Sequence, residues 1–352
     1  MSDFPTNNSD AVLAAQAGAS SGAPPANAQD VLARAKHARE RIVAEIGKRV
    51  FGQEEVVDFL LLGLFAGGHT LMMGVPGLAK TLLVSTLSQC LGLGFSRIQF
   101  TPDLMPSDIT GTDILEDDPE TGRRRFRFVP GPIFTNLLLA DEINRTPPKT
   151  QSALLQAMQE RQVSVGGHTY DLSAPFLVFA TQNPIEQEGT YPLPEAQLDR
   201  FMFHVRVDYP SLADEMRVAH HTTMGDDAPI EQVIGPDEII ALQRLVRSVD
   251  AGNAVVDFAV RLVRATRPSD STAPDLVKRY VTFGAGPRAS QFLVLGAKTR
   301  AVLRGYEAPS VQDVRDLAHS TLRHRLLVNF HGEADGVDAD AIIDELLRVV
   351  SA

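Results

Sequence analysis

The first segment whose residue types indicate chemistry is a glycine-containing loop followed by a lysine and a threonine. Residues 74–81 read GVPGLAKT, which matches the phosphate-binding pattern G-x-x-x-x-G-K-[ST] except that Ala79 stands where the last glycine belongs. In such a loop, backbone N–H groups point at phosphate oxygens and the next helix presents its positive N-terminus. The sequence therefore predicts a phosphate-binding loop. A Gly/Pro turn between two core elements is the alternative interpretation.

The lysine and the threonine favour phosphate binding. The Lys80 ammonium could neutralise the β and γ phosphates, and the Thr81 hydroxyl could bind magnesium. A structural turn alone would not explain a lysine at the start of a helix, because a cation there opposes the helix dipole. The remaining residues assigned to this nucleotide-binding segment are Gly74, Val75, Pro76, Gly77, Leu78, Ala79 and Leu82.

Two carboxylates follow an apolar run in residues 136–145, NLLLADEINR. Side chains alternate along a strand, so Asp141 and Glu142 are expected to point in different directions and to have separate tasks. Asp141 is predicted to hold the magnesium shell, and Glu142 to orient and deprotonate an attacking water. Solvated residues of a turn are the alternative. The phosphate-binding loop upstream favours the catalytic interpretation.

Three further polar residues could complete a nucleotide site. Asn183 ends the apolar run PFLVFATQNP and could hydrogen-bond a γ phosphate, although Asn-Pro is also a common turn signal. Arg200 could pair with Asp199 or Glu195, or it could reach a γ phosphate bound by an adjacent subunit. Arg288 follows a proline in the first turn of a predicted helix, where an arginine is misplaced unless an anion lies nearby.

Composition limits the classes of function. The chain has 352 residues, 44% of them apolar, which is enough for two domains with a sizeable core. The longest apolar runs are far shorter than the ~20 residues of a membrane span, and the N-terminus lacks a signal segment, so we expect a cytoplasmic protein without membrane insertion. The net charge of -11 opposes general attraction to nucleic acid. Cys90 is the single cysteine, so an intrachain disulfide is excluded and a buried small hydrophobic residue is expected.

The first two thirds of the chain alternate between short apolar runs and helical patterns. Residues 1–28 are poor in large apolar side chains and are predicted to be a disordered tail, and an amphipathic helix is predicted from 28 to 50. Strands are predicted at residues 69–73, 96–100, 136–140, 175–181 and 203–207. This alternation indicates an α/β fold over residues 29–209, with a parallel sheet flanked by helices.

After Pro210 the pattern is helical throughout. Helices are predicted at residues 211–224, 237–249, 254–267, 288–304, 311–327 and 338–349. Ser211 with Asp214, and Ser310 with Asp313, match the helix-start pattern. No segment here resembles a strand, so residues 210–352 are predicted to form an all-helical second domain.

Five motifs in this order, GVPGLAKT, LLLADEINR, ATQNP, PEAQLDRF and GAGPRA, resemble those of the MoxR family of AAA+ ATPases. The resemblance covers nearly the whole chain after the tail. It implies an AAA+ P-loop NTPase core with a helical lid, ATP and magnesium as cofactors, and self-association into a ring, expected to be a hexamer. The implied roles are Walker A for Lys80 and Thr81, Walker B for Asp141 and Glu142, sensor 1 for Asn183, arginine finger in trans for Arg200, sensor 2 in cis for Arg288, and adenine packing for residues 50–53, including Gly52 and Gln53.

The resemblance also implies a role for two predicted hairpins. Residues 113–128 look like the hairpin inserted in helix 2 of this clade, and residues 162–172, with a Gly-Gly turn, like the hairpin before sensor 1. Both face the central pore in related rings. MoxR-type proteins are thought to act as chaperone-like remodellers of clients with von Willebrand factor A domains, in complex assembly or in metal or cofactor insertion. That client class is what the resemblance implies here.

Other functions remain as alternatives. The main alternative is a DNA-translocating or DNA-remodelling AAA+ motor, because the cluster RRRFR at 123–127 could contact nucleic acid. Two features make this less favoured: the acidic total charge, and the preceding acids Glu116, Asp117, Asp118 and Glu120. A static ATP-binding switch would be favoured if a catalytic carboxylate or an arginine finger were missing. Histidines 220, 221, 319 and 324 lack the partners of a zinc site.

Overall fold

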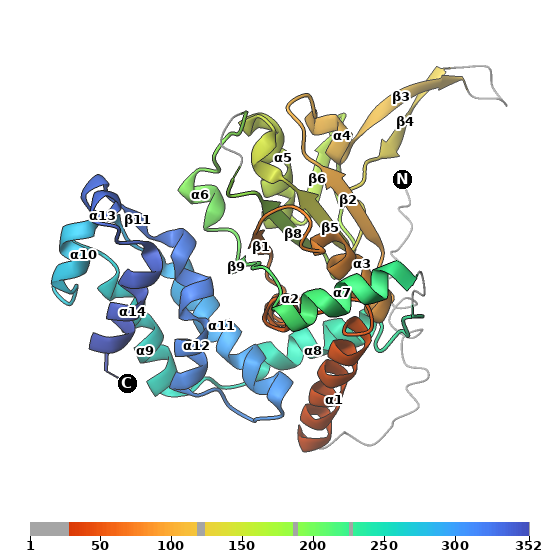
Figure 1. The fold of residues 1–352 in the computed structure, drawn as a ribbon. Helices are drawn as coiled ribbons and strands as arrows, with labels where there is room; N and C mark the ends of the chain where they lie inside the picture. The colour runs from red at the N-terminus through yellow and green to blue at the C-terminus, as the bar shows by residue number, and fades with distance from the viewer. Residues whose placement is uncertain (1–27, 118–123, 186–188, 225–227, 352) are drawn as a thin grey trace, which may run out of the picture.

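The computed structural model describes residues 28–117, 124–185, 189–224 and 228–351. The predicted tail lies outside these residues except for its last one, and so does the tip of the first predicted hairpin, residues 118–123. Figure 1 shows a core built on a sheet and, to its left, a group of helices from the C-terminal part of the chain. None of the helices in the described ranges is both long and apolar enough to cross a bilayer.

The core is a five-stranded sheet in the order β2-β5-β8-β1-β9, in which every neighbouring pair is parallel. The strands are β1 (Thr70–Met73), β2 (Phe95–Gln99), β5 (Leu137–Asp141), β8 (Leu177–Gln182) and β9 (Phe203–Arg206). All five residues of β5 are buried, as expected for a strand covered on both faces. The predicted parallel sheet is therefore confirmed.

Helices cover the sheet, and α2 is the largest buried helix that was not predicted from the sequence. The core helices are α1 (Ala28–Ile46), α2 (Glu54–Ala66), α3 (Lys80–Leu91) and α5 (Pro148–Glu160), with the short α4 (Pro106–Thr110) and α6 (Glu195–Leu198). Helix α2 is buried on nearly all sides, so its sequence EEVVDFLLLGLFA shows no amphipathic period that would identify it.

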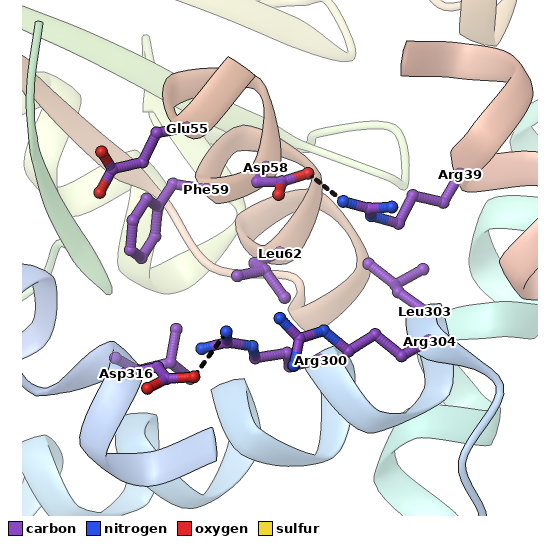
Figure 2. A pocket seen from close by; sticks show the side chains of 10 residues that line it. Arg39, Glu55, Asp58, Phe59, Leu62, Arg300, Leu303, Arg304 and Asp316 are labelled. Carbon is purple, nitrogen blue, oxygen red and sulfur yellow. Dashed lines mark hydrogen bonds and ion pairs between the residues drawn. The ribbon is translucent and has the colours of Figure 1, made fainter. Parts of the chain in front are cut away.

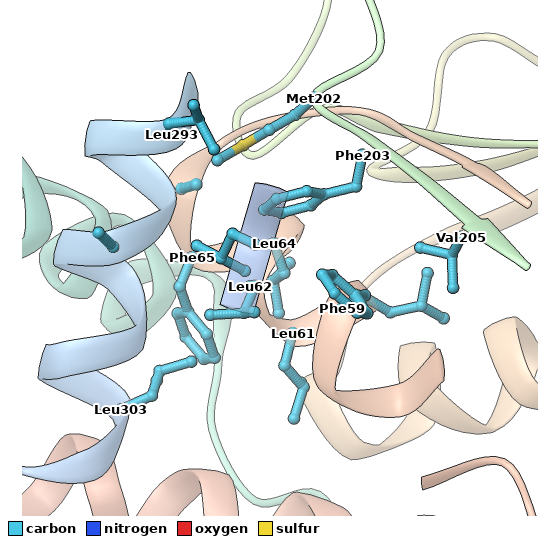
Figure 3. Close-up of a cluster of buried hydrophobic side chains, with 14 of the residues drawn as sticks. Phe59, Leu61, Leu62, Leu64, Phe65, Met202, Phe203, Val205, Leu293 and Leu303 are labelled. Carbon is cyan, nitrogen blue, oxygen red and sulfur yellow. The ribbon is translucent and has the colours of Figure 1, made fainter. Parts of the chain in front are cut away.

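Helix α2 joins the sheet to the C-terminal helices through a shared apolar cluster. Figure 3 shows side chains of α2, of the start of β9 and of α11 (Pro287–Arg304) in this cluster. Phe59 packs edge-on against Phe203 with ring centroids 5.3 Å apart. At Gly63 an added Cβ would lie 2.7 Å from the hydroxyl oxygen of Thr70, so the glycine permits the close approach of α2 to β1. The core and the lid therefore share one hydrophobic interior.

Two antiparallel hairpins project from the core, as predicted. They are β3 (Gly111–Asp117) with β4 (Arg124–Pro130), and β6 (Gln162–Val165) with β7 (His168–Asp171). Phe128 of the first hairpin stacks on Tyr170 of the second, with centroids 4.1 Å apart and planes 14° from parallel. Figure 1 shows β3 and β4 extending away from the body of the molecule. The hairpins thus contact each other at their bases.

The C-terminal part is helical, with one correction. The predicted helices are present as α7 (Leu212–Met224), α8 (Pro236–Ser248), α9 (Gly252–Ala265), α11, α12 (Val311–Leu322) and α14 (Ala339–Val349), although α12 ends five residues before the predicted end at 327. Two further short helices are α10 (Asp275–Tyr280) and α13 (Phe330–Ala334). The Ser310–Asp313 capping box at the start of α12 is confirmed. The expectation that this part has no strand is wrong, because β10 (Val281–Phe283) pairs antiparallel with β11 (Leu327–Val328). Both strands are too short to show alternation in the sequence.

Two buried histidines lie where the lid meets the sheet. His204 of β9 and His324, which follows α12, have ring centroids 5.6 Å apart at 83°. Burial, together with the nearby charges of Arg323 and Arg206, lowers the pKa of His204 to about 3. Burial, followed by the charge of Arg325, likewise holds the pKa of His324 well below its usual range. Both rings are therefore neutral at physiological pH.

Acidification is expected to lower the stability of the protein through these buried histidines. In the unfolded chain a histidine binds a proton near pH 6.5, whereas folded His204 stays neutral down to about pH 3. The stability that neutral His204 contributes is therefore complete above pH 6.5 and is lost as the pH falls below 6.5. Between about pH 7.5 and about pH 5.5 the free energy of unfolding should fall by ~1 kcal/mol for this residue. Urea unfolding of the wild type and of His204→Leu at both pH values measures the effect. Equal losses in the two proteins would refute it.

Candidate functional site

The predicted nucleotide residues surround one cavity at the carboxyl ends of the parallel strands. The cavity has a volume of about 520 Å³ and lies where the loop after β1 meets the ends of β5 and β8. Ligands of open α/β sheets bind in this kind of crevice. The predicted residues that line it are Gly74, Pro76, Gly77, Leu78, Ala79, Lys80, Thr81, Leu82, Asp141, Glu142 and Asn183.

The loop from Gly74 to Thr81 has the conformation of a phosphate cradle. Ala79 has φ 55° and ψ 19°, in the left-handed region where a glycine is usual, and this costs on the order of 1 kcal/mol. The Lys80 ammonium donates hydrogen bonds to the carbonyls of Gly74 and Val75, at 2.6 and 2.7 Å. Val75 thus contributes a carbonyl to the lysine although its side chain does not line the cavity.

Helix α3 begins at Lys80 and directs its first turn at the cavity. The carbonyl of Ala79 accepts a backbone hydrogen bond from Leu83, which closes the first turn. The N–H groups before Leu83 have no carbonyl of a preceding helical turn to bind, so they form an anion site at the positive end of the helix. Burial lowers the pKa of Lys80, while Asp141 and Glu142 oppose that shift. The two carboxylates therefore favour the charged form of Lys80, but the effect of burial is larger.

Asp141 is a nearly buried carboxylate with two groups of donors. Its Oδ1 accepts a hydrogen bond from the Thr181 hydroxyl at 2.6 Å. Its Oδ2 accepts from Nε and Nη2 of Arg97, at 3.0 and 2.6 Å. Arg97, which was not predicted as a site residue, lies on β2 opposite Leu139, two residues before Asp141 on the same face of the sheet. An arginine within a predicted strand was the available signal.

Glu142 lies just beyond the end of β5, so strand alternation does not set the direction of its side chain. Strand β5 ends at Asp141, and Glu142 has φ 57° and ψ 49°, so a left-handed turn of the backbone redirects the side chain. Its Oε2 accepts hydrogen bonds from Gln99 at 2.7 Å and from Arg145 at 3.2 Å. The explanation from strand alternation is corrected, and Gln99 and Arg145 join the site as partners of this carboxylate.

Thr181 connects the two carboxylates. Its hydroxyl donates to Oδ1 of Asp141 and accepts a hydrogen bond from the backbone N–H of Glu142 at 2.8 Å. The residue is only 1% exposed, so water cannot replace these bonds easily. Thr181 therefore fixes both the Asp141 side chain and the turn at Glu142. The position of Thr181, a polar residue at the end of the apolar run FLVFAT, was the signal in the sequence that could have identified its role.

Asn183 lies at the cavity and also shapes a turn. The residue lines the cavity beside Thr181 and is 7% exposed. Its Oδ1 accepts a hydrogen bond from the N–H of Ile185 at 3.1 Å, which is the turn interpretation of Asn-Pro. The turn interpretation is therefore confirmed, and the hydrogen bond to a γ phosphate stays a prediction.

The oxygen donors at the cavity suit magnesium. Thr81 and Asp141 line the same cavity, and a hydroxyl and a carboxylate are hard oxygen ligands. Asp141 already binds the cationic guanidinium of Arg97, so its Oδ2 is placed to accept positive charge. The described residues contain no cluster of three or more His, Cys, Asp or Glu that could hold a metal ion. A magnesium ion with few protein ligands fits such a site.

The predicted adenine segment is not among the residues that line the phosphate cavity. Gln53 donates a hydrogen bond to the carbonyl of Asp208 at 3.1 Å, and Gly52, with φ 72°, packs closely against Asp214. Phe51 lines a separate open cavity on α7, where the guanidinium of Arg217 lies 4.4 Å from its ring centroid. Gly52 is therefore positioned against α7, Gln53 is bound to the segment between β9 and α7, and neither lines the phosphate cavity.

The two predicted arginines lie together, outside the phosphate cavity. Arg288 donates to Oδ2 of Asp199 at 3.0 Å, and Nη1 of Arg200 donates to the carbonyl of Leu155. Asp199, one of the two carboxylates considered as a partner of Arg200, instead binds Arg288 and Arg325. Figure 1 shows α6 and the lid helices on one side of the core and α3 toward the other. The structure does not bring Arg288 to the phosphate cavity of its own chain.

Other charged clusters are internally compensated. A cavity of about 160 Å³ between α2 and the lid contains three arginines (Figure 2), but Arg39 pairs with Asp58 at 2.5 Å and Arg300 with Asp316 at 2.6 Å. Arg304 lies 3.7 Å from Asp313.

The basic cluster of the first hairpin is also compensated in its described part. Arg127 pairs with Glu116 at 3.1 Å, and Arg124 with Asp117 at 3.4 Å. These cross-strand pairs follow from the antiparallel register of β3 and β4. The structure therefore gives no support to the DNA-binding alternative.

The hydroxyl of Thr181 is expected to be essential for turnover. Thr181→Val removes a hydrogen bond to an ionised carboxylate and leaves the Glu142 N–H unpaired, so ATP turnover should fall by about 10- to 100-fold while nucleotide affinity changes little. Thr181→Ser keeps the hydroxyl and is the matched control, with turnover near that of the wild type. Steady-state phosphate release measures both variants. Full activity of Thr181→Val would refute the assignment.

Comparison with known proteins agrees with this architecture. Residues 69–203 match the model of the ATPase family associated with various cellular activities (AAA), and residues 274–346 match the AAA lid domain. The chain is 44% identical to the chaperone MoxR1 of Mycobacterium tuberculosis over 94% of this chain and 86% of that protein, and 34% identical to the protein MoxR of Paracoccus denitrificans over 83% and 90%. A solved structure from Cytophaga hutchinsonii superposes with a TM-score of 0.86 at 39% identity, covering 92% of this chain and 97% of that one. The chain belongs to the MoxR family of AAA ATPases.

Proposed function

We propose that this protein uses ATP hydrolysis at the cavity after β1 to remodel client proteins. The observation that supports this most strongly is the convergence of Lys80, Thr81, Asp141, Glu142 and Asn183 on one cavity from three separate strands. Family membership implies ATP hydrolysis. We assign residues 29–209 to the core and residues 210–352 to the lid.

Each residue has a proposed task in hydrolysis. Lys80 and the N–H groups at the start of α3 bind the phosphates, while Thr81 and Asp141 hold magnesium. When bound, the metal supplies positive charge to the phosphate oxygens. Glu142 accepts a proton from the attacking water once it leaves its partners Gln99 and Arg145.

The arginines are proposed to act between subunits. Arg200 lies outside the phosphate cavity of its own chain, so it can reach a γ phosphate only in a neighbouring subunit. Arg288 is held 3.0 Å from Asp199, the residue before Arg200, and we therefore propose that it also serves the neighbour's site, in place of the cis role that the family resemblance implied. A homo-oligomeric ring, taken as a hexamer, places the sites at its interfaces.

The proposed output is remodelling of a client protein. The relative from Mycobacterium tuberculosis is named a chaperone. On the first hairpin, Leu115 and Phe126 face each other across β3 and β4 and are 53% and 75% exposed, an apolar pair suited to contact another protein. Clients with von Willebrand factor A domains are the proposed class.

Binding and chemistry should separate at two residues. Lys80→Ala should lose nucleotide affinity, because the phosphates lose their cation. Glu142→Gln should bind ATP but lower turnover by ~100-fold or more, because the amide cannot accept the proton. Equilibrium binding of a fluorescent ATP analogue and phosphate release, each with and without EDTA, measure these effects. Wild-type turnover in Glu142→Gln would contradict the assignment.

Action of Arg200 in trans predicts complementation. Arg200→Ala should bind ATP yet hydrolyse it poorly, because charge at the γ phosphate is no longer stabilised. Mixed with Glu142→Gln subunits, it should regain activity, since interfaces that pair an intact Glu142 with an intact Arg200 form again. Phosphate release over a range of mixing ratios is the measurement. Absence of recovery at every ratio would show that the site is not shared in this way.

A further inference from the structure

A buried arginine of the lid is inserted into the turn that carries Arg200. Arg325 follows α12, and its side chain is 2% exposed. Its Nη2 donates to the carbonyls of Asp199 and Phe201, at 2.9 and 2.6 Å, and its Nε donates to Oδ1 of Asp199 at 2.8 Å. The guanidinium thus binds the backbone on both sides of Arg200 and fixes the path of this turn.

Asp199 is the carboxylate that binds two arginines of the lid. Its Oδ1 accepts from Arg325, and its Oδ2 accepts from Nη1 of Arg288 at 3.0 Å. Burial lowers the pKa of Arg325 to about 10, and Asp199 opposes that shift. A buried guanidinium is costly without a partner charge, so loss of this carboxylate leaves Arg325 uncompensated.

Neighbouring groups make this cluster a rigid part of the fold. His324, adjacent to Arg325, lies with its Nε2 3.1 Å from the carbonyl of Phe201. The guanidinium of Arg325 lies 5.2 Å from the ring centroid of Phe292 on α11, the helix that starts with Pro287 and Arg288. Arg200 and Arg288 are therefore attached to the same packed cluster from two different parts of the chain.

We propose that Asp199 is a positioning residue that holds Arg200 and Arg288 as one unit, presented to the ATP site of the neighbouring subunit. The inference rests on the proposed action of Arg200 in trans. It adds that the correct placement of Arg200 depends on the Asp199–Arg325 ion pair, and that the lid takes part in the neighbour's reaction through this pair.

Neutral variants of Asp199 test the role of its charge. Asp199→Asn keeps the size of the side chain but removes the charge that binds both arginines, so turnover should fall by at least about tenfold, with nucleotide affinity unchanged at the intact cavity. Arg325→Lys should show the same pattern, because a lysine cannot make the forked contacts to Asp199 and Phe201. Asp257→Asn, which breaks the exposed pair with Arg261 on α9, is the matched control and should leave turnover unchanged. Wild-type turnover in Asp199→Asn would overturn the proposal.

Subunit mixing shows at which site Asp199 acts. Asp199→Asn mixed with Glu142→Gln should recover activity, at about a quarter of the interfaces in an equal random mixture, because each active interface needs one subunit of each kind in a fixed order. Asp199→Asn mixed with Arg200→Ala should not recover, because both changes damage the same surface. Recovery with Arg200→Ala would place Asp199 at the site of its own chain and overturn the proposal.

The remaining outcomes separate this inference from the proposed function. If Arg200→Ala recovers with Glu142→Gln but Asp199→Asn recovers with neither partner, Asp199 has a structural role only and the proposal is wrong, while the trans finger stands. If Arg200→Ala itself does not recover, the trans finger is wrong and the proposal falls with it. Thermal unfolding of each variant, with a midpoint near that of the wild type, confirms that recovery is measured on folded subunits.

Discussion

The side-by-side pairing of three parallel strands, β1, β5 and β8, is the constraint on which the site depends. Parallel pairing brings the carboxyl ends of strands that are far apart in the sequence to one edge of the sheet. The loop with Lys80 follows β1, Asp141 ends β5 directly before Glu142, and Thr181 and Asn183 lie at the end of β8 and just after it. A shift in this pairing would separate the phosphate-binding loop from the carboxylates, and no local change could restore the site.

A second layer of polar contacts gives the carboxylates their separate orientations. The Thr181 hydroxyl joins Asp141 to the backbone of Glu142, and Gln99 binds the Glu142 side chain. The two hydrogen bonds of Thr181 are withdrawn from water, so each is stronger than on the surface and costs more to lose, whereas the Gln99 contact is exposed. Buried polar contacts also fix the turn before β9, where Arg325 pairs with Asp199. Since core and lid share one apolar cluster, that turn and the lid belong to the same packed body.

Much of the fold and the cavity could be predicted from the sequence because local patterns encode them. Apolar runs bounded by turns marked the strands, and the motif GVPGLAKT marked the loop. Helix α2 was missed because a helix buried on all sides has no amphipathic period. Arg97, Thr181 and Asp199 were missed because their roles arise from contacts between distant segments. The position of Arg288 beside Asp199 likewise follows from lid packing, which no local pattern reports.

The central claim is that residues of two subunits meet at one terminal phosphate. An electron cryomicroscopy structure of the assembled Glu142→Gln protein with ATP and magnesium tests it most directly. The account predicts Lys80 and Asn183 of one subunit and Arg200 of the next within hydrogen-bonding distance of the same γ phosphate. Nucleotide bound at an interface where Arg200 of the neighbour lies far from that phosphate would contradict it.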